Sequence, residues 1–310
     1  MPLPDPLREL SARVSNWGRW GTDDERGTLN LITSDAVQRG AAAVRQGRVF
    51  SLAIPFASDG PQWDSVNMPL RANPKLNTYA VNVSFTGDRA DFTTSDDAFS
   101  MGSQAATHWD ALAHVGYEGK LYNDTDDSVV SAGGASQLGV QSIGAVATRG
   151  VLLDVARVHD VDHFDHNYAI TADDLDRAVE ATRVTIESGD AVLVRTGQMH
   201  FLRTGDRPRY SHPSPGLSTD TIAWLRDHDV AAVATDTLTF EVYPCEDPAV
   251  FMPVHMIHLR DMGLLQGQVW ALDDLAADCA TDGQYDFLLC ATPLPLTGAV
   301  GAPVAPTAIK

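Results

Sequence analysis

The chain has 310 residues, and 44% of them are hydrophobic, so it is long enough to bury a sizeable core. Its 41 acidic residues outnumber its 22 Lys and Arg residues and give a formal net charge of −19. This charge opposes binding to nucleic acid or to an anionic membrane, and the sequence contains no basic patch that would offset it.

The first 47 residues are expected to form an N-terminal extension, a loop followed by a helix. Thr33 or Ser34 would cap this helix, and Gly47 would stop it. Trp17 and Trp20 lie among three glycines in the preceding loop. They either anchor that loop to the core or form the walls of a substrate pocket. The N-terminus lacks a basic segment followed by an apolar run, so we expect no signal peptide.

Short apolar and alternating runs predict the strands, and no run is long enough to span a membrane. Helical patterns lie between the later strands, with Thr171 and Ser218 as N-caps and a further helix within 261–277. This alternation predicts an α/β fold, and the consecutive early strands predict a mixed sheet. Without linkers or repeats, residues 1–310 are expected to form one domain. The predicted strands are Val49–Ile54, Thr78–Phe85, Gly150–Asp154, Ala191–Arg195, Val230–Thr235 and Tyr285–Cys290.

The cysteines are few and widely separated. Cys245, Cys279 and Cys290 form neither a disulfide framework nor a CxxC metal site, and this usage fits a reducing cytoplasm. We therefore expect a cytoplasmic protein.

Polar side chains recur at every second residue from Gln104 to Asp110. If this stretch is extended, Gln104, Ala106, His108 and Asp110 project from one face of one strand. An imidazole, a carboxylate and an amide on one face form a plausible ligand set for a divalent metal. The alternative is a hydrogen-bonded polar strand with incidental histidines.

His114 follows four residues after Asp110, beyond the expected end of the strand. This position suits a general acid or base better than a metal ligand. Further along the chain, His255 and His258 would share a face if their segment is helical. Each of these two could also be an ordinary capped or solvated helix histidine. No GxSxG or Walker motif offers a competing site.

The segment from Gln104 to His114 resembles the HxGTHxDxPxH motif of the cyclase family that includes kynurenine formamidase and isatin hydrolase. Thr107, His108, Asp110 and His114 match the motif. The chain as a whole resembles the longer, actinobacterial branch of that family, from about Trp17 onward. The matching blocks are RWGTDDERGTLNLIT, THWDALAHVGYEGKLYN, RGVLLDVAR, GDAVLVRTG and HLRDMGLLQG.

The resemblance implies a swivelling β/β/α fold and a homo-oligomer, dimer or tetramer. Its members hydrolyse amides or lactones of small cyclic or aryl substrates with Zn²⁺ or Mn²⁺. In the motif the first two His and the Asp bind metal, and the last His is the general acid/base. A downstream His, matching His255, and a Glu about a dozen residues later complete the site.

This sequence departs from the motif at several positions. The first His is Gln104, the Gly is Ala106, the Pro is Leu112, and the downstream Glu falls on Gln268. Two amides thus replace basic or charged groups, and Asp110 is left as the only carboxylate.

The remaining set of His108, Asp110 and His255 would hold one Zn²⁺ or Mn²⁺, with Gln268 or Gln104 as a weak oxygen ligand. The leading hypothesis is a metal-dependent hydrolase of a small cyclic or aryl amide or lactone, with His114 as the proton shuttle. One alternative is a metal-independent cyclase or dehydratase acting on a polyketide-like intermediate. The other is a family member that binds a small ligand without catalysis.

Overall fold

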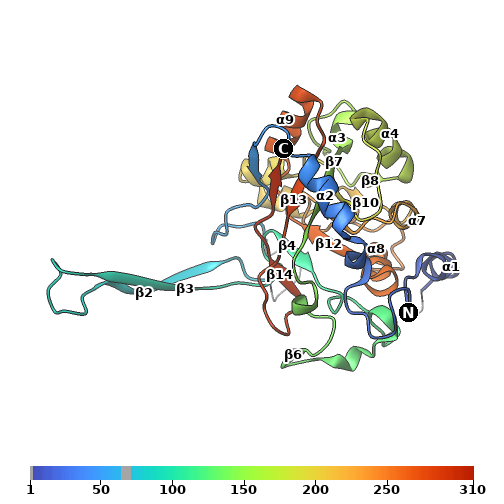
Figure 1. The fold of residues 1–310 in the computed structure, drawn as a ribbon. Helices are drawn as coiled ribbons and strands as arrows, with labels where there is room; N and C mark the ends of the chain where they lie inside the picture. The colour runs from blue at the N-terminus through green and yellow to red at the C-terminus, as the bar shows by residue number, and fades with distance from the viewer. Residues whose placement is uncertain (1–2, 64–70) are drawn as a thin grey trace.

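The computed structural model describes residues 3–63 and 71–310. Within these ranges nine strands form one mixed sheet that crosses the centre of the molecule (Figure 1). Its central strands β7, β9, β11 and β12 run parallel, and the other neighbouring pairs are antiparallel. In sheet order the strands are β1 (Val49–Ser51), β15 (Thr307–Ile309), β13 (Asp286–Cys290), β7 (Ala147–Asp154), β9 (Ala191–Arg195), β11 (Ala232–Thr235), β12 (Leu265–Gln268), β4 (His108–Asp110) and β14 (Gly301–Pro303).

Both faces of the parallel strands are buried, because their apolar residues supply two cores. In β7, Leu152 packs into one core while Val151 and Leu153 pack into the other. Helix α9 (Asp273–Asp282) contributes to the first core, and α1 (Asp5–Val14), α4 (Ala172–Thr182) and α7 (Thr221–Asp227) contribute to the second. Continuous apolar runs are typical of parallel strands covered on both faces. The predicted α/β fold with a mixed sheet and an N-terminal helix is confirmed.

Local signals located two helix starts correctly and one wrongly. Thr33 accepts a hydrogen bond from the backbone N–H of Ala36 and caps α2 (Ser34–Ala42), and Thr171 forms a reciprocal capping box at the start of α4. Ser218 is not a cap, since α7 follows Asp220 and no side chain caps it. Helix α2 also ends at Ala42, before the expected stop at Gly47.

The further helix expected within 261–277 is α9, which begins at Asp273 and runs beyond that range to Asp282. Here a π-helical turn (η6, Ile257–Met262) leads through β12 into α9. The remaining elements are α3 (Val155–Val158), α5 (Met199–Arg203), α6 (Arg207–Ser211), α8 (Pro253–Met256), β5 (Val130–Ser131), β6 (Gly134–Ala135), β8 (Ala169–Ile170), β10 (Gly216–Leu217) and the 3₁₀ turns Gly27–Leu31, Tyr122–Asp124, Asp127–Val129 and Val140–Ser142.

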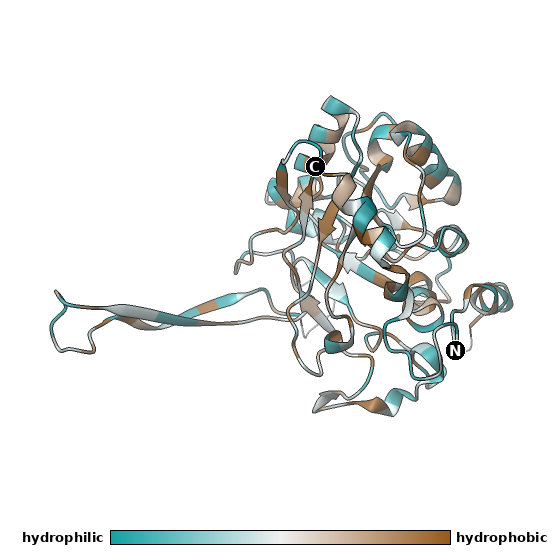
Figure 2. Ribbon diagram, in the orientation of Figure 1, coloured by the Kyte–Doolittle hydropathy of each residue, from teal (hydrophilic) through white to brown (hydrophobic). Residues whose placement is uncertain are grey.

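A two-stranded ribbon, here called the arm, projects far from the body (Figure 1). It consists of β2 (Lys75–Val83) and β3 (Thr94–Ser100), and its register is shifted twice. The expected strand Thr78–Phe85 is found at Lys75–Val83, displaced toward the N-terminus, and nearly all of its residues are exposed. Apolar and polar residues alternate along the arm in Figure 2. Its exposed large apolar side chains include Leu76, Tyr79, Val81, Phe85, Phe92 and Phe99.

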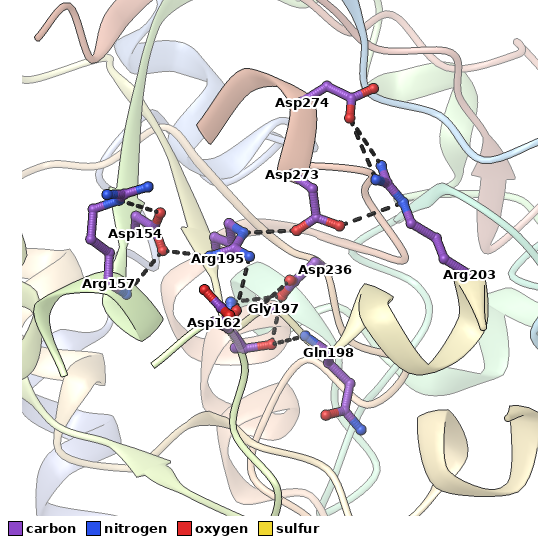
Figure 3. Close-up of polar contacts among 11 residues, drawn as sticks. Asp154, Arg157, Asp162, Arg195, Gly197, Gln198, Arg203, Asp236, Asp273 and Asp274 are labelled. Carbon is purple, nitrogen blue, oxygen red and sulfur yellow. Dashed lines mark hydrogen bonds and ion pairs between the residues drawn. The ribbon is translucent and has the colours of Figure 1, made fainter. Parts of the chain in front are cut away.

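A network of ion pairs and hydrogen bonds connects the carboxyl ends of three parallel strands (Figure 3). Arg195, at the end of β9, donates to Asp154 at the end of β7 and to Asp273 at the start of α9, both at 2.8 Å. Asp236, directly after β11, accepts hydrogen bonds from Thr196 and from the backbone of Gly197. Because these groups satisfy one another, we assign the network a structural role, that of fixing the loop after β11. Among the described residues, no helix is both long and apolar enough to cross a membrane.

Candidate active site

Two adjacent strands present the polar side chains of the site. Strand β4 pairs with β12 so that His108 lies opposite Gln268 and Asp110 lies opposite Gln266. Residues two apart on a strand share a face, so all four can meet on one side of the sheet. Trp109, between His108 and Asp110, points into the core on the other side. The strand pattern thus explains why His108 and Asp110 converge.

Gln104 reaches the site by a different route from the one the sequence suggested. Strand β4 covers only His108–Asp110, and Gln104 lies in a turn before it. Its amide Nε2 is 3.3 Å from Nδ1 of His114. Gly301 leaves room for this side chain, since a Cβ there would lie 2.6 Å from Nε2 of Gln104. The expectation that one extended strand places Gln104 beside His108 and Asp110 is therefore wrong.

The tautomers of two imidazoles are fixed by their neighbours. Nδ1 of His108 is 2.6 Å from the carbonyl oxygen of Ala106, which can only accept, so Nδ1 donates there and Nε2 is the nitrogen that faces Asp110. Nδ1 of His255 likewise donates to Oε1 of Glu241 at 2.5 Å. Glu241 is itself buried and accepts hydrogen bonds from the backbone N–H groups of Val254 and His255. This carboxylate–histidine arrangement is characteristic of metal-binding imidazoles.

Two glutamine amides surround the carboxylate. Nε2 of Gln268 donates to Oδ2 of Asp110 at 2.7 Å and lies 3.1 Å from Nε2 of His255. Nε2 of Gln266 lies 3.3 Å from the same Oδ2. Burial by itself would raise the pKa of Asp110, but the imidazoles of His114 and His108 outweigh it and hold this pKa well below its usual range. Asp110 is therefore a buried carboxylate anion.

The donor set fits a single cation. Nε2 of His108 and Oδ1 of Asp110 lie 3.5 Å apart, both buried and both without a hydrogen-bond partner among the described residues. Orphaned buried polar atoms of this kind are costly unless a ligand satisfies them. Within residues 3–63 and 71–310, no group of three His, Cys, Asp or Glu side chains lies close enough together to hold a metal ion. The amide of Gln268 lies between His255 and Asp110 and contacts both. Because a glutamine side chain can also supply its amide oxygen to a cation, Gln268 is compatible with an ion bound at the unpartnered atoms of His108 and Asp110.

His114 stands between a carboxylate and a guanidinium. Its Nε2 is 3.7 Å from Oδ1 of Asp110 and 3.3 Å from a terminal nitrogen of Arg71. Burial is the main reason why the pKa of His114 falls to about 4; Arg71 lowers it further, while Asp110 opposes the shift. The ring is therefore neutral at pH 7 and can accept a proton.

A hollow of about 550 Å³ opens beside His114, His255 and Gln268. Neither tryptophan lines it. Trp17 donates to the carbonyl oxygen of Arg260, and Trp20 lies beneath the guanidinium of Arg19. Trp17 thus anchors its loop, as in the simpler of the two sequence-based interpretations. The apolar walls are instead formed by Val115, Leu238, Tyr243, Phe251, Met252 and Met256.

The two downstream histidines have different surroundings. His255 faces the hollow, whereas His258 is fully buried, with no hydrogen-bond partner at either ring nitrogen. Burial lowers the pKa of His258 to about 3, so it is a neutral core residue. Sequence reasoning missed Arg71, Glu241 and Gln266. Of these, only Gln266 had a local signal, because it stands two residues before Gln268 on a strand.

The family model Cyclase, described as "Putative cyclase", matches residues 50–242. A crystal structure described as a novel cyclase is 33% identical, with a TM-score of 0.88 over 97% of this chain and 99% of that chain. No curated protein matched the sequence.

Two further solved structures share the fold at low sequence identity. An isatin hydrolase bound to the product analogue thioisatinate is 20% identical, with a TM-score of 0.61 over 89% of this chain and 98% of that chain. A protein described as a predicted metal-dependent hydrolase from Bacillus stearothermophilus is 17% identical, with a TM-score of 0.54 over 85% and 98%.

Proposed function

The chain belongs to the Cyclase family, and we propose that it is a metal-dependent hydrolase of a small cyclic or aryl amide or lactone. One observation carries the proposal: Nε2 of His108 and Oδ1 of Asp110 face each other, buried and unpartnered among the described residues. Hydrolysis is named in the descriptions of the two more distant relatives and is extended here to this chain.

The metal would be held by His108 and Asp110, with His255 and the amide oxygen of Gln268 as further ligands. Zn²⁺ and Mn²⁺ both accept such a nitrogen and oxygen set. A bound ion of this kind polarises a carbonyl and lowers the pKa of water. Since Asp110 is the only carboxylate placed in the set, the residues fit one ion and not a carboxylate-bridged pair.

His114 moves the proton in the proposed reaction. As water oxygen bonds to the carbonyl carbon, a ring nitrogen of neutral His114 accepts the water proton. The bond from carbon to nitrogen or oxygen then breaks, and His114 returns the proton to the leaving atom. Asp110, 3.7 Å away, stabilises the imidazolium formed between these two events. Glu241 maintains the orientation of His255 through its 2.5 Å hydrogen bond.

Metal content is the decisive measurement for this proposal. Wild-type protein and His108→Ala are incubated with Zn²⁺ or Mn²⁺, desalted and analysed by mass spectrometry, with exposed His166→Ala as the matched control. We expect about one ion per chain in wild type and control, and loss in His108→Ala. Metal-free wild type after both incubations would overturn the metal assignment. Bound metal with no turnover across a panel of cyclic and aryl amides and lactones would overturn the hydrolase assignment.

A second candidate, a metal-independent cyclase or dehydratase, is favoured by the position of Gln268. Its amide already hydrogen-bonds Asp110 and contacts His255, so part of the site is satisfied without an ion. Asp110 and His114 would then carry out acid–base chemistry on a polyketide-like substrate. Activity that survives exhaustive chelation would select this candidate over the first.

We also propose that the protein acts as a homo-oligomer, dimer or tetramer. The arm supports this, because a two-stranded ribbon with exposed apolar side chains is only marginally stable alone in water.

A further inference from the structure

The walls of the 550 Å³ hollow differ in charge from the rest of this acidic protein. The chain has 41 Asp and Glu residues against 22 Lys and Arg residues, yet among the described residues that line the hollow none is acidic. Among the same described residues, Arg71 is therefore the one permanently charged side chain among mainly apolar walls, inside a strongly acidic molecule.

Arg71 is not neutralised by any described carboxylate. Within residues 3–63 and 71–310, no Asp or Glu oxygen lies within 4.0 Å of its guanidinium. Its side-chain hydrogen-bond contact is with Nε2 of His114 at 3.3 Å. His114 lies between Arg71 and Asp110, and its Nε2 is 3.7 Å from Oδ1 of Asp110. By contrast, the half-buried Arg195 is bound by two carboxylates.

A half-buried guanidinium with donors to spare favours an anionic partner. Its planar fork of N–H groups matches the two oxygens of a carboxylate, and such charge-assisted hydrogen bonds are about twice as strong as neutral ones. His114 contacts only one of these donors, and an imidazole brings no negative charge. The apolar walls strengthen the attraction, because charges interact more strongly where water is displaced.

The same hollow offers aromatic surfaces. His212 and Tyr243 meet edge to face with ring centroids 5.1 Å apart, and Phe251 lies 6.4 Å from Tyr243. Phe251 is 66% exposed, so its ring has surface to bury when a ligand enters. An aromatic ligand ring can pack against such ring faces and edges and gain area burial together with a favourable ring–ring contact.

We infer that the substrate is an aromatic acid: a ring that binds against Tyr243 and Phe251 and a carboxylate that binds Arg71. This deepens the proposed function and rests on it, because it assigns the substrate class of the same hollow. Arg71 is thus a specificity-determining residue, and the matching neutral compound binds poorly.

The test is calorimetric binding of benzoate and of benzamide, an isosteric pair that differs in charge. Wild type is compared with Arg71→Met, Arg71→Lys and Arg8→Met. Arg8 is a surface residue paired with Glu118, so its variant removes the same charge from outside the hollow. Thermal unfolding of each variant reports whether it folds. Acetate, which lacks the ring, tests the contribution of the apolar walls.

We expect wild type and Arg8→Met to bind benzoate at least roughly tenfold more tightly than benzamide or acetate. Arg71→Met should lose this preference, and Arg71→Lys should retain part of it. Equal binding of benzoate and benzamide by wild type, or an unchanged preference in folded Arg71→Met, would overturn the inference. Because binding is read without turnover, the two proposals fail separately: an inactive protein that still shows Arg71-dependent benzoate binding would refute the hydrolase proposal but retain Arg71 as the carboxylate-binding residue of the hollow.

Discussion

Nε2 of His108 lies 3.5 Å from Oδ1 of Asp110, and among the described residues neither atom has a hydrogen-bond partner. Within the described part of the chain, Oε1 of the neighbouring Gln266 is unpartnered as well, but other polar groups around the pair are hydrogen-bonded. Ala106 fixes the tautomer of His108, and two glutamine amides bind the second oxygen of Asp110. The unsatisfied pair marks where a cation is expected.

Replacement of His114 should separate catalysis from metal binding. In His114→Ala we expect kcat to fall by roughly 10²–10⁴, because proton transfer by a positioned imidazole contributes about that much. Metal content should not change, since His114 is not placed among the ligands. Steady-state kinetics and metal analysis on the same preparation check both parts. Full activity in this variant would remove the role assigned to His114.

Replacement of Gln268 by Glu should strengthen metal binding. The added carboxylate would give the site a second negative ligand beside Asp110, from which Nε2 of Gln268 is 2.7 Å away. We expect Gln268→Glu to retain its ion at chelator concentrations that strip wild type. A competition titration with a chelating dye measures this. If the variant loses metal more readily than wild type, then Gln268 lies outside the ligand set.

Glu241 should act through His255. Glu241→Gln removes the charge that holds Nδ1–H of His255 at 2.5 Å, so we expect metal affinity to fall roughly 10–100-fold. The conservative Glu241→Asp keeps the negative charge and should retain part of the metal affinity. A purely structural role for Glu241 would not produce this difference between the two variants. Exposed Glu246→Gln serves as the matched control and should bind metal like wild type. Unchanged affinity in Glu241→Gln would exclude the positioning role.

Asp236 should make stability depend on pH. Burial, reinforced by Asp273 and opposed by Arg195, raises the pKa of Asp236 from 3.8 to about 6. The folded state therefore binds the proton more tightly than the unfolded state. The contribution of Asp236 to the free energy of unfolding is therefore fully present below about pH 4 and is lost as the pH rises to about 6. The loss from this group is on the order of 3 kcal/mol, from about 1.4 kcal/mol per pKa unit.

Chemical denaturation of wild type and Asp236→Asn at pH 4, 5, 6 and 7 measures this contribution. The variant cannot ionise, so its free energy of unfolding should fall less between pH 4 and 7. Its absolute stability should be lower at pH 4, since an amide cannot accept all of the hydrogen bonds from Thr196 and Gly197. Identical pH slopes for the two proteins would contradict the prediction.

The arm should mediate self-association. Leu76 and Phe99 are directly paired across the two strands, and both are well exposed. The double variant Leu76→Ser/Phe99→Ser should shift the mass measured by light scattering from a multiple of 33.3 kDa toward 33.3 kDa. Val161→Ser, which alters an exposed apolar side chain on the body, should leave the mass unchanged. A 33.3 kDa wild type would remove the oligomer proposal.

The sequence by itself determined the elements whose signals are local. Ala191–Arg195 was predicted at its observed bounds, because a continuous apolar run in a buried parallel strand stands out from its flanks. Thr171 was identified as a cap because capping depends on residues only three apart. The pairing of His108 with Asp110 followed from the two-residue repeat of a strand.

Only the tertiary structure decided what surrounds that pair. Arg71, Glu241 and Tyr243 come from loops far from β4 in sequence, and a loop side chain takes its direction from the core that anchors the loop, not from its neighbours in sequence. Trp17 and Gln104 show the same limit. The sequence left open whether Trp17 anchors its loop or lines a pocket, and long-range contacts direct it to Arg260. The sequence suggested that Gln104 shares a strand face with His108, but it instead reaches the site from a turn and lies against His114. The sequence specified the chemistry of β4, and the packing of distant loops specified the pocket in which that chemistry acts.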